Sequence, residues 1–519
     1  MAIIIGTSGN DTLQGALGGY DDTLTGGGGN DIFFESANPS YTSVITDFGG
    51  VGKTTNPTAA VIAEVDTLNF QSNSGFTAQD LILTQNGNNL EINFQESTFR
   101  RKIILENFAL SNLENLTKST GATVDLGNIL FFGQTTITDS FDVFDANSTQ
   151  STVFKKNTVT FLNDLNNNVS GFDNSNDVIN GQGGDDIIEG LSGNDILRGG
   201  AGNNTLNGGI DNDFLDADFP SGNNLLNGGD GNDSLFASGS DISLSEYVSI
   251  YGKNLDDRSL GNNTLNGGVG DDSLDASGSL GDNLLDGGDG NDFLDISGNE
   301  TSTDLQSSSS RSNGDNTLNG GAGNDILDAT GSSGDNLLFG GDGNDFLDIS
   351  GDSYQYFDVY SSSRSSGKNL LSGGDGNDTL TASGASGNNT LNGGNGDDSL
   401  TGGGGNDWLF GEGGTDTFVF NSFDEGLDLI RDFGSINEPN ELIQVSAAGF
   451  GGGLSVGVLQ ASQFTLGESA TTLLQRFIYN STTGALFFDS DGSADAFTQV
   501  QFAGLSAGLS LTNNNFVVV

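Results

Sequence analysis

The chain contains no cysteine and no histidine, and its 519 residues include only four prolines and one tryptophan. Disulfides, thiolate chemistry and imidazole metal ligands are therefore excluded. A zinc protease of the H-E-x-x-H type and a Ser-His-Asp hydrolase both require histidine, so this sequence cannot carry out either chemistry.

Positive charge is also scarce, because 15 Lys and Arg stand against 70 Asp and Glu, a net charge of -55. Nucleic acid and anionic membrane surfaces repel such a chain, and cations are its expected partners. No stretch approaches the roughly 18 apolar residues of a membrane-spanning helix. We therefore expect no transmembrane segment. The opening residues 1–6 have no basic segment, so we also expect no cleaved N-terminal signal peptide.

Glycine is abundant, with 82 copies, and much of it lies in a repeated nonapeptide. Residues 287–295 and 340–348 both read GGDGNDFLD, an instance of G-G-x-G-x-D-x-U-x with U a large apolar residue. The glycines allow positive φ and close backbone approach. The aspartate at position six supplies a hard oxygen, which suits calcium. The repeat therefore predicts stacked calcium-binding turns with U pointing inward.

The composition divides the chain into four segments. Residues 1–34 carry N-terminal repeats, 35–170 form a non-repetitive β module, 171–420 hold the main array with inserted loops, and 421–519 form a second β module. Alternating apolar residues predict strands at 90–94 and 102–105, with a hairpin turn at Asn86-Gly87. Residues 31–34 and 44–49 resemble 416–420 and 429–434, which indicates either an ancient duplication or the use of one capping module at both ends.

The main array has two chemically different edges. Its motifs are spaced mostly by 20 and 33 residues, giving a 53-residue super-repeat from 267 to 320 to 373. One edge has aspartate at position six and the other mostly has asparagine, which predicts a one-sided calcium spine opposite a hydrogen-bonded amide ladder. The predicted metal ligands, including those of the N-terminal repeats, are Asp11, Asp22, Asp31, Asp177, Asp186, Asp195, Asp213, Asp233, Asp272, Asp292, Asp325, Asp345, Asp378, Asp398, Asp407 and Asp416. The asparagine row comprises Asn204, Asn224, Asn263, Asn283, Asn316, Asn336, Asn369 and Asn389, flanked by Asp186 and Asp407.

Three insertions precede asparagine half-turns, so we expect them to leave the roll on that edge. Two interpretations stay open: a Tyr/Ser/Arg contact surface, or polar loops whose phase records duplication. The candidate interaction residues are Tyr247, Tyr251, Arg258, Arg311, Tyr354, Tyr356, Tyr360 and Arg364.

With these repeats the chain resembles the RTX (repeats-in-toxin) family of type I secreted bacterial proteins. Its tail, at 477–480, 484–492 and 516–519, is similar to the C-terminal region of cyanobacterial calcium-binding proteins of this kind. The resemblance implies an all-β fold, a calcium-binding parallel β-roll flanked by two non-repetitive β modules. It also implies several calcium ions as cofactor and export of an unfolded chain by an uncleaved C-terminal signal, with folding outside the cell.

The expected function is that of a secreted, extracellular or cell-surface structural protein without enzyme activity. Calcium would stiffen it, and it would self-assemble into a fibre, surface layer or matrix through the apolar runs 3–5 and 516–519, unless these fold back onto their own modules. The first alternative is an adhesin or glycan-binding protein that uses the inserts to bind surface glycans. The second is a polysaccharide-acting enzyme that uses carboxylates alone, since Asp and Glu are plentiful.

Overall fold

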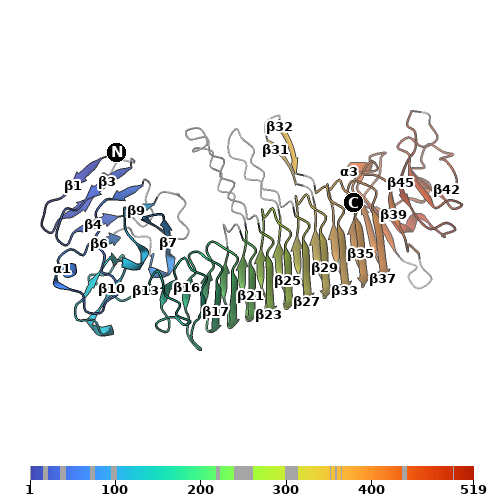
Figure 1. Cartoon of the computed structure of the whole chain (residues 1–519). Coiled ribbons are helices and arrows are strands. Elements are labelled where there is room, and N and C mark those ends of the chain that lie inside the picture. Colours follow the sequence, from blue (N-terminus) through green and yellow to red (C-terminus); the bar gives the residue numbers. More distant parts are fainter. Residues whose placement is uncertain are drawn as a thin grey trace. The chain divides into compact units, whose positions relative to one another are not determined.

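The computed structural model describes the chain except residues 1, 16–20, 36–41, 71–75, 95–101, 218–221, 239–260, 298–313, 351, 357–358, 364, 435–440 and 495. It forms two compact units, Met1–Ile210 and Asp211–Val519. Strands dominate both units (Figure 1), and the described α-helices are single turns, α1 (Ala59–Ile62) and α3 (Ala447–Phe450). In the part of the chain that is described, no helix is long and apolar enough to span a membrane. The predicted all-β class is confirmed.

Two parallel sheets form most of the second unit. In one sheet the order is β20-β22-β24-β26-β28-β30-β34-β36-β38-β40-β46, ending in the antiparallel β41. In the other it is β21-β23-β25-β27-β29-β33-β35-β37-β39-β45-β44-β43-β42. The bounds are β20 Phe214–Asp216, β21 Leu225–Asp230, β22 Ser234–Phe236, β23 Thr264–Val269, β24 Ser273–Asp275, β25 Leu284–Asp289, β26 Phe293–Asp295, β27 Thr317–Ala322, β28 Ile326–Asp328, β29 Leu337–Asp342, β30 Phe346–Asp348, β31 Asp352–Tyr356, β32 Val359–Ser363, β33 Leu370–Asp375, β34 Thr379–Thr381, β35 Thr390–Asn395, β36 Ser399–Thr401, β37 Trp408–Gly413, β38 Thr417–Phe420, β39 Asp428–Ile430, β40 Leu442–Val445, β41 Gly457–Val458, β42 Phe464–Leu466, β43 Phe477–Asn480, β44 Ala485–Phe488, β45 Val500–Gly504 and β46 Phe516–Val518.

The nonapeptide explains why each coil folds as it does. Its last three residues form a short strand whose central leucine points inward, so Leu274, Leu294 and Leu327 pair in register and have no exposed surface. A longer strand such as β25 returns along the second sheet with Leu285 equally buried. Successive coils are offset by 20 and 33 residues in turn, as the motif spacing predicts. These stacked coils are the predicted parallel β-roll.

The first unit opens with a short roll that leads into a module. Its parallel strands stack as β1-β3-β5 and β2-β4-β6, and the sheets continue through β9-β8-β7 and β12. The Asn86-Gly87 hairpin prediction is confirmed, since β7 and β8 are antiparallel around that turn. The bounds are β1 Ile3–Ile5, β2 Thr12–Gln14, β3 Asp22–Thr25, β4 Ile32–Glu35, β5 Ser43–Ile45, β6 Thr67–Phe70, β7 Leu81–Asn86, β8 Asn89–Phe94, β9 Ile103–Leu105, β10 Asn115–Leu116, β11 Leu126–Gly127 and β12 Ile129–Leu130.

Coil stacking resumes earlier in this unit than the repeats themselves indicate. The parallel series β13-β14-β16-β18 begins at Phe141, within the segment that the sequence analysis assigns to the first module, and β15-β17-β19 forms the second series. The bounds are β13 Phe141–Val143, β14 Val159–Phe161, β15 Asn168–Ser170, β16 Val178–Asn180, β17 Ile187–Ser192, β18 Ile196–Arg198 and β19 Thr205–Ile210. Non-motif residues can therefore adopt the coil geometry when apolar side chains fill its interior.

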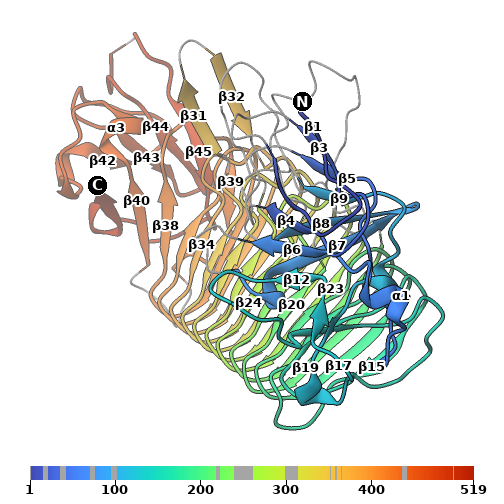
Figure 2. The same ribbon diagram turned by 90° about the vertical axis from the view of Figure 1, so that its left-hand side faces the viewer.

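Each unit contains the same module, as the sequence echo predicted. In the first unit β5 pairs in parallel with β9, followed by antiparallel β8 and β7; in the second, β39 pairs in parallel with β45, followed by antiparallel β44 and β43. The ring centroids of Phe33 and Phe48 are 5.8 Å apart at 49°, and those of Phe418 and Phe433 are 5.9 Å apart at 46°. Figure 2 shows β40 of the second module beside β38, with which the array ends.

The two apolar terminal runs have different environments. β46 lies between β40 and β41, and Phe516 and Val518 are buried, so the prediction that this run pairs with a neighbouring subunit is wrong. It is an inner strand because the module core includes Phe477, whose ring centroid lies 5.2 Å from that of Phe516. In contrast, β1 ends its sheet, and Ile3 and Ile5 are 70% and 69% exposed.

Candidate calcium spine

The aspartate edge is built from tight glycine turns. Gly288 and Gly290 have φ of 111° and 152°, a region that disfavours any residue with a Cβ. The turn places Asp292 next to the backbone of the preceding coil, and the N–H of Asp272 donates to Asp292 Oδ1 at 2.9 Å. Asp292 in turn donates its N–H to Asp325 Oδ1 at 2.8 Å, and Asp325 to Asp345 Oδ1 at 2.9 Å. One oxygen of each carboxylate thus joins successive coils.

The second carboxylate oxygen has no hydrogen bond at most of these positions. The side chains are nevertheless buried; Asp292 is 2% exposed. Buried carboxylate oxygens normally have a donor or a cation, because desolvating a charge is costly. On the aspartate edge, the Oδ2 atoms that lack a hydrogen-bond partner belong to Asp233, Asp272, Asp292, Asp325, Asp345, Asp378 and Asp398. The same is true of Asp186 and Asp407, which flank the asparagine row.

A glycine lies against each of these free oxygens. A Cβ placed on Gly287 would lie 2.3 Å from Asp292 Oδ2 and 2.6 Å from the carbonyl oxygen of Gly320 in the next coil. The same two contacts recur at Gly320, with Asp325 Oδ2 at 2.4 Å and the Gly340 carbonyl oxygen at 2.6 Å. The leading glycine of the motif is therefore required sterically, and it leaves carboxylate and carbonyl oxygens converging on one place.

The electrostatics of the row favour a bound cation. Burial, followed by repulsion from neighbouring aspartates, raises the pKa of Asp272 and Asp325 to about 7. Burial likewise raises the pKa of Asp292 to about 6. A positive charge among these carboxylates removes both causes at once, because it solvates the anions and screens their repulsion.

The donor set matches calcium. Calcium takes carboxylate and carbonyl oxygens in flexible geometry, and both kinds are present at each turn. In this row the residues that would hold the ions are the aspartates with a free Oδ2, and the ions would join consecutive coils electrostatically. The predicted ligands Asp11 and Asp177 differ, because Asp11 Oδ2 accepts from Thr7 while Asp177 Oδ1 and Oδ2 accept from Ser175 and Phe172.

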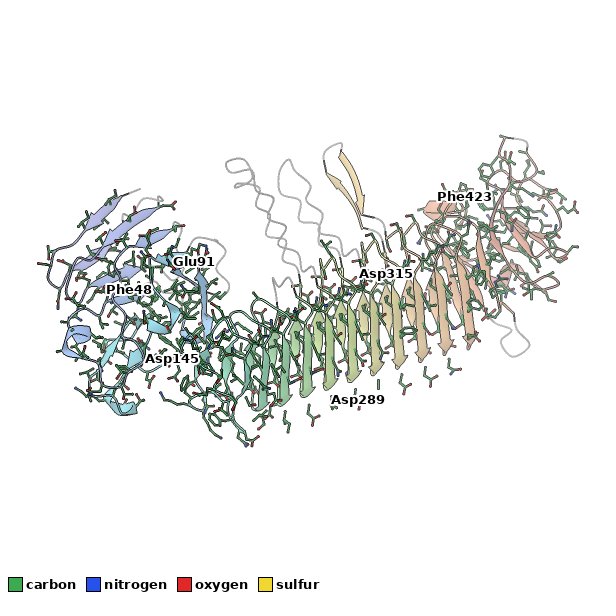
Figure 3. All side chains as sticks on the ribbon, viewed as in Figure 1. Phe48, Glu91, Asp145, Asp289, Asp315 and Phe423 are labelled. Carbon is green, nitrogen blue, oxygen red and sulfur yellow. The ribbon has the colours of Figure 1, made fainter. Side chains whose placement is uncertain are left out.

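The asparagine edge satisfies its polar atoms without any ion, which confirms the predicted ladder. Asn283 donates both its N–H and its Nδ2–H to Asn316 Oδ1, each at 2.9 Å, and its Nδ2 also donates to the Gly281 carbonyl at 3.0 Å. Asn336 does the same toward Asn369 Oδ1 at 2.9 and 3.0 Å. Figure 3 shows Asp289 and Asp315 at opposite edges of the array, near the aspartate and asparagine rows respectively.

A second, exposed ladder runs beside each row and was not anticipated from the sequence. The N–H of Asn324 donates to Asn291 Oδ1 at 2.9 Å, and that of Asn344 to Asn324 Oδ1 at 2.8 Å. On the other edge Asp315 N–H donates to Asp282 Oδ1 at 2.9 Å. The signal was present, because Asn or Asp occupies position five of almost every half-turn.

Acidic residues outside the repeats continue the rows into the modules, and the sequence analysis missed them. Asp66 is 3% exposed; its Oδ1 accepts from Asp31 N–H at 2.8 Å and its Oδ2 from Gly49 N–H at 2.7 Å. In the second unit the N–H of Asp407, in the array, donates to Oδ1 of Asp428, in the module, at 3.0 Å. The available signal is an acid one or two residues before an apolar strand, without the glycines.

A further acidic column, at position nine of the motif, also went unnoticed. Asp275, Asp295, Asp328 and Asp348 are register partners on neighbouring strands of one sheet. Burial, with repulsion from Asp275 and Asp328, raises the pKa of Asp295 to about 6. Each carboxylate accepts from the N–H two residues further on, as Asp295 does from Ser297 at 2.7 Å. These aspartates therefore shape the turns that follow their strands.

The predicted interaction residues remain predictions. Tyr247, Tyr251, Arg258, Arg311 and Arg364 lie outside the described residues. The backbone of Tyr354, Tyr356 and Tyr360 belongs to the antiparallel hairpin β31–β32. In Figures 1 and 3 this hairpin leaves the array on the side of Asp315, the asparagine edge, as the position of its insertion predicts.

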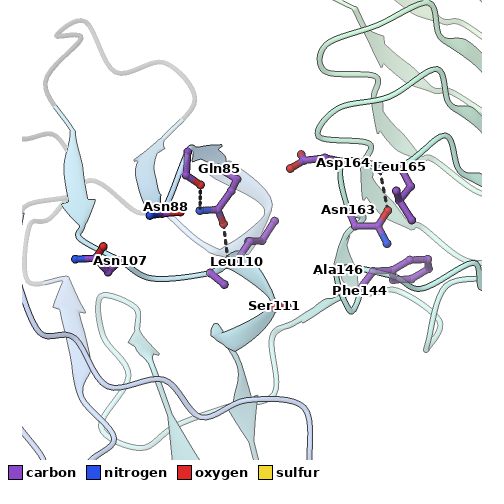
Figure 4. A pocket seen from close by; sticks show the side chains of 12 residues that line it. Gln85, Asn88, Asn107, Leu110, Ser111, Phe144, Ala146, Asn163, Asp164 and Leu165 are labelled. Carbon is purple, nitrogen blue, oxygen red and sulfur yellow. Dashed lines mark hydrogen bonds between the residues drawn. The ribbon is translucent and has the colours of Figure 1, made fainter.

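Two other polar sites in the first unit use their groups internally. A cavity of about 450 Å³ is lined by Gln85 and Asn163 (Figure 4), but the Gln85 amide accepts from Leu110 N–H and donates to the Phe108 carbonyl. The carboxylates of Glu114, Asp139 and Asp142 lie within 4.8 Å of one another. Lys53 and Lys155 pair with this cluster at 3.2 and 2.7 Å, so its charges are already balanced in part.

Comparison with known families gives one match. The RTX calcium-binding nonapeptide repeat matches residues 5–34, 173–197, 189–219, 221–241, 259–278, 276–295, 312–330, 328–352, 365–386 and 383–418. No curated protein matches the chain. The matched segments carry the free aspartate oxygens of the array, and such repeats bind several calcium ions per array. The chain is therefore an RTX-type calcium-binding protein.

Proposed function

We propose that the protein is a secreted structural element whose coil array folds and stiffens on binding extracellular calcium. The observation that carries the proposal is the row of buried aspartate oxygens without hydrogen-bond partners. Extracellular calcium sites typically have dissociation constants of about 10⁻⁴ to 10⁻³ M, so these turns would fill outside a cell and stay empty in the cytosol. Glycine-rich turns lose much conformational entropy on ordering, which makes binding and folding one event.

Calcium control would also suit export of an unfolded chain. The C-terminal strands that resemble a type I secretion signal belong to the second module, where Phe488 and Phe502 are buried. A signal of this kind is accessible only while the module is unfolded. We therefore place calcium-induced folding after export, with the protein acting at the cell surface or in an extracellular matrix.

A calcium titration tests this function. Purified protein, freed of divalent ions by a chelator, should show a weak β signal in far-UV circular dichroism. The signal should rise cooperatively at about 0.1–1 mM calcium, whereas the same concentrations of magnesium should have little effect, since magnesium demands a small octahedral site. A complete β-roll spectrum in excess chelator would show that calcium is not needed for folding.

An adhesin is the second candidate, because the β31–β32 hairpin leaves the array on one edge. Inserts on a single edge of a stiff array are suited to presenting contact residues to a ligand. Deleting residues 352–363 would then abolish binding to a panel of surface glycans while leaving calcium-induced folding intact. Equal glycan binding by the full chain and by the deletion variant would show that the hairpin is not the glycan-binding site.

A further inference from the structure

The asparagine row changes its chemistry at its C-terminal end. Asn389 N–H donates to Asp407 Oδ1 at 2.6 Å, and Asp407 N–H donates to Asp428 Oδ1 at 3.0 Å. The backbone ladder is therefore the same as between asparagines. The side chains differ, because a carboxylate has no Nδ2–H to donate along the ladder.

The two carboxylates are buried and face the same glycine. Asp407 has no exposed surface, Asp428 is 3% exposed, and Asp407 Oδ2 has no hydrogen-bond partner. A Cβ on Gly402 would lie 2.8 Å from Asp407 Oδ2 and 3.1 Å from Asp428 Oδ2. Two anionic oxygens thus converge on one interior point, as carboxylate and carbonyl oxygens do on the aspartate edge.

Nothing among the described basic residues neutralises this pair. Arg431, three residues after Asp428, instead stacks on Trp408, with its guanidinium carbon 4.5 Å from the centroid of the ring. Glu425, which accepts from Asn421 N–H, adds further negative charge near both aspartates. Burial and mutual repulsion raise the pKa of Asp428, so the pair would either share a proton or bind a cation.

We propose that Asp407 and Asp428 together bind one calcium ion at the C-terminal end of the asparagine edge, an inference that rests on the calcium-dependent function proposed above. Asp428 lies beyond the last residue matched by the repeat family, 418, so the site joins a repeat to the module. Asp407 immediately precedes β37 and Asp428 begins β39, which pair in parallel. The ion would fasten the last coil of the asparagine edge to the strand that starts the module.

The principal test counts ions on the full chain by native mass spectrometry at saturating calcium. Asp428→Asn should bind one calcium fewer than the wild type, and its fold should survive because asparagine holds the same ladder position upstream, at Asn336, Asn369 and Asn389. Asp432→Asn is the matched control, since the Asp432 carboxylate already accepts from the N–H groups of Gly411 and Glu412 at 3.2 and 2.8 Å. This control should keep the wild-type count.

The single tryptophan supplies a local readout that does not depend on the total count. Trp408 directly follows Asp407, so terbium substituted for calcium at this site should luminesce when excited through tryptophan. That luminescence should be lost in Asp428→Asn and in Asp407→Asn, and retained in Asp432→Asn. Unchanged luminescence and ion count in Asp428→Asn would overturn the site and indicate a shared proton. Absence of calcium binding by the wild type would instead overturn the proposed function, and this site with it.

Discussion

At the scale of the residue, one atom separates the two edges of the array. Asparagine and aspartate have the same shape, and both accept the N–H of the preceding coil through Oδ1. The Nδ2 of asparagine then donates twice, whereas Oδ2 of aspartate is left buried without a donor. The amide edge is stable without metal, and the carboxylate edge needs a cation.

Matched substitutions on the two edges should therefore have different consequences. Asp345→Ala should remove calcium from its site. Asn336→Ala should leave the calcium count unchanged but lower the free energy of unfolding by about 1–3 kcal/mol, because the N–H and Nδ2–H of Asn316 lose their shared acceptor. Calorimetry counts the ions and urea unfolding measures stability. Equal loss of calcium from both variants would refute the division into two edges.

A buried glutamate in the first unit should make stability depend on pH. Glu35 is 7% exposed, Ser43 donates to its Oε2 at 2.9 Å, and its Oε1 has no hydrogen-bond partner. Burial raises its pKa from 4.5 to about 7. The folded state therefore holds the proton more tightly than the unfolded state, and this contribution to stability is lost as the pH rises from about 4.5 to 7.

Glu35→Gln should consequently stabilise the unit by about 2–3 kcal/mol near pH 8 and have little effect near pH 5. Thermal unfolding at the two pH values, in the same calcium concentration, measures the difference. Glu468→Gln, at an exposed position, is the control and should change neither. A pH-independent effect of Glu35→Gln would mean that the glutamate is ionised in the folded state.

At the scale of the element, the repeats could be predicted from the sequence because their contacts are periodic. Residues such as Leu294 and Leu327 recur at a fixed phase of the motif, so their register in one sheet follows directly from counting. The modules have no such period. The partner of the run 516–519 depends on non-local packing with β40 and Phe477, which a local apolar pattern cannot specify.

Prediction of the acidic residues in the two rows has the same limit, because a local pattern does not specify non-local contacts. Position six could be assigned to calcium because glycines mark the turn, whereas Asp66 and Asp428 occupy equivalent places without those glycines. Only the backbone N–H groups that donate hydrogen bonds to their carboxylates show that they continue the rows. A sequence pattern therefore finds the ligands that need a tight turn and misses those placed by tertiary contacts.

Replacing the first glycine of a motif by alanine should weaken the calcium-binding turn. In Gly287→Ala the added Cβ would meet Asp292 Oδ2 and the Gly320 carbonyl, both closer than 3 Å. Overpacking of this kind costs about 1–3 kcal/mol, and here it should also raise the calcium concentration needed for folding. Gly9→Ala is the control, because the nearest atom would be 4.0 Å from its Cβ. Calcium-dependent circular dichroism of both variants gives the comparison; identical midpoints would show that the turn can adapt.

At the scale of the whole molecule, the first strand of the chain offers an exposed apolar edge for association. β1 ends its sheet with Ile3 and Ile5 on the surface, while β46 is enclosed by two neighbours. An edge strand of this kind can pair with a strand of a second copy. We predict association in calcium through β1, and not through the C-terminal run.

Introducing charge on this edge tests the prediction. Ile3→Lys with Ile5→Lys should abolish association in about 1 mM calcium, because charged side chains block edge pairing, while Ile4, which packs on the core, is left in place. Val456→Lys alters a side chain that is 79% exposed and lies outside any strand, so it should associate like the wild type. Light scattering over a range of protein concentrations distinguishes the outcomes. If the wild type stays monomeric at every concentration, fibre formation through β1 is refuted and the adhesin becomes the better account. If both variants lose association alike, the change in net charge is the cause, and the edge strand is not the contact.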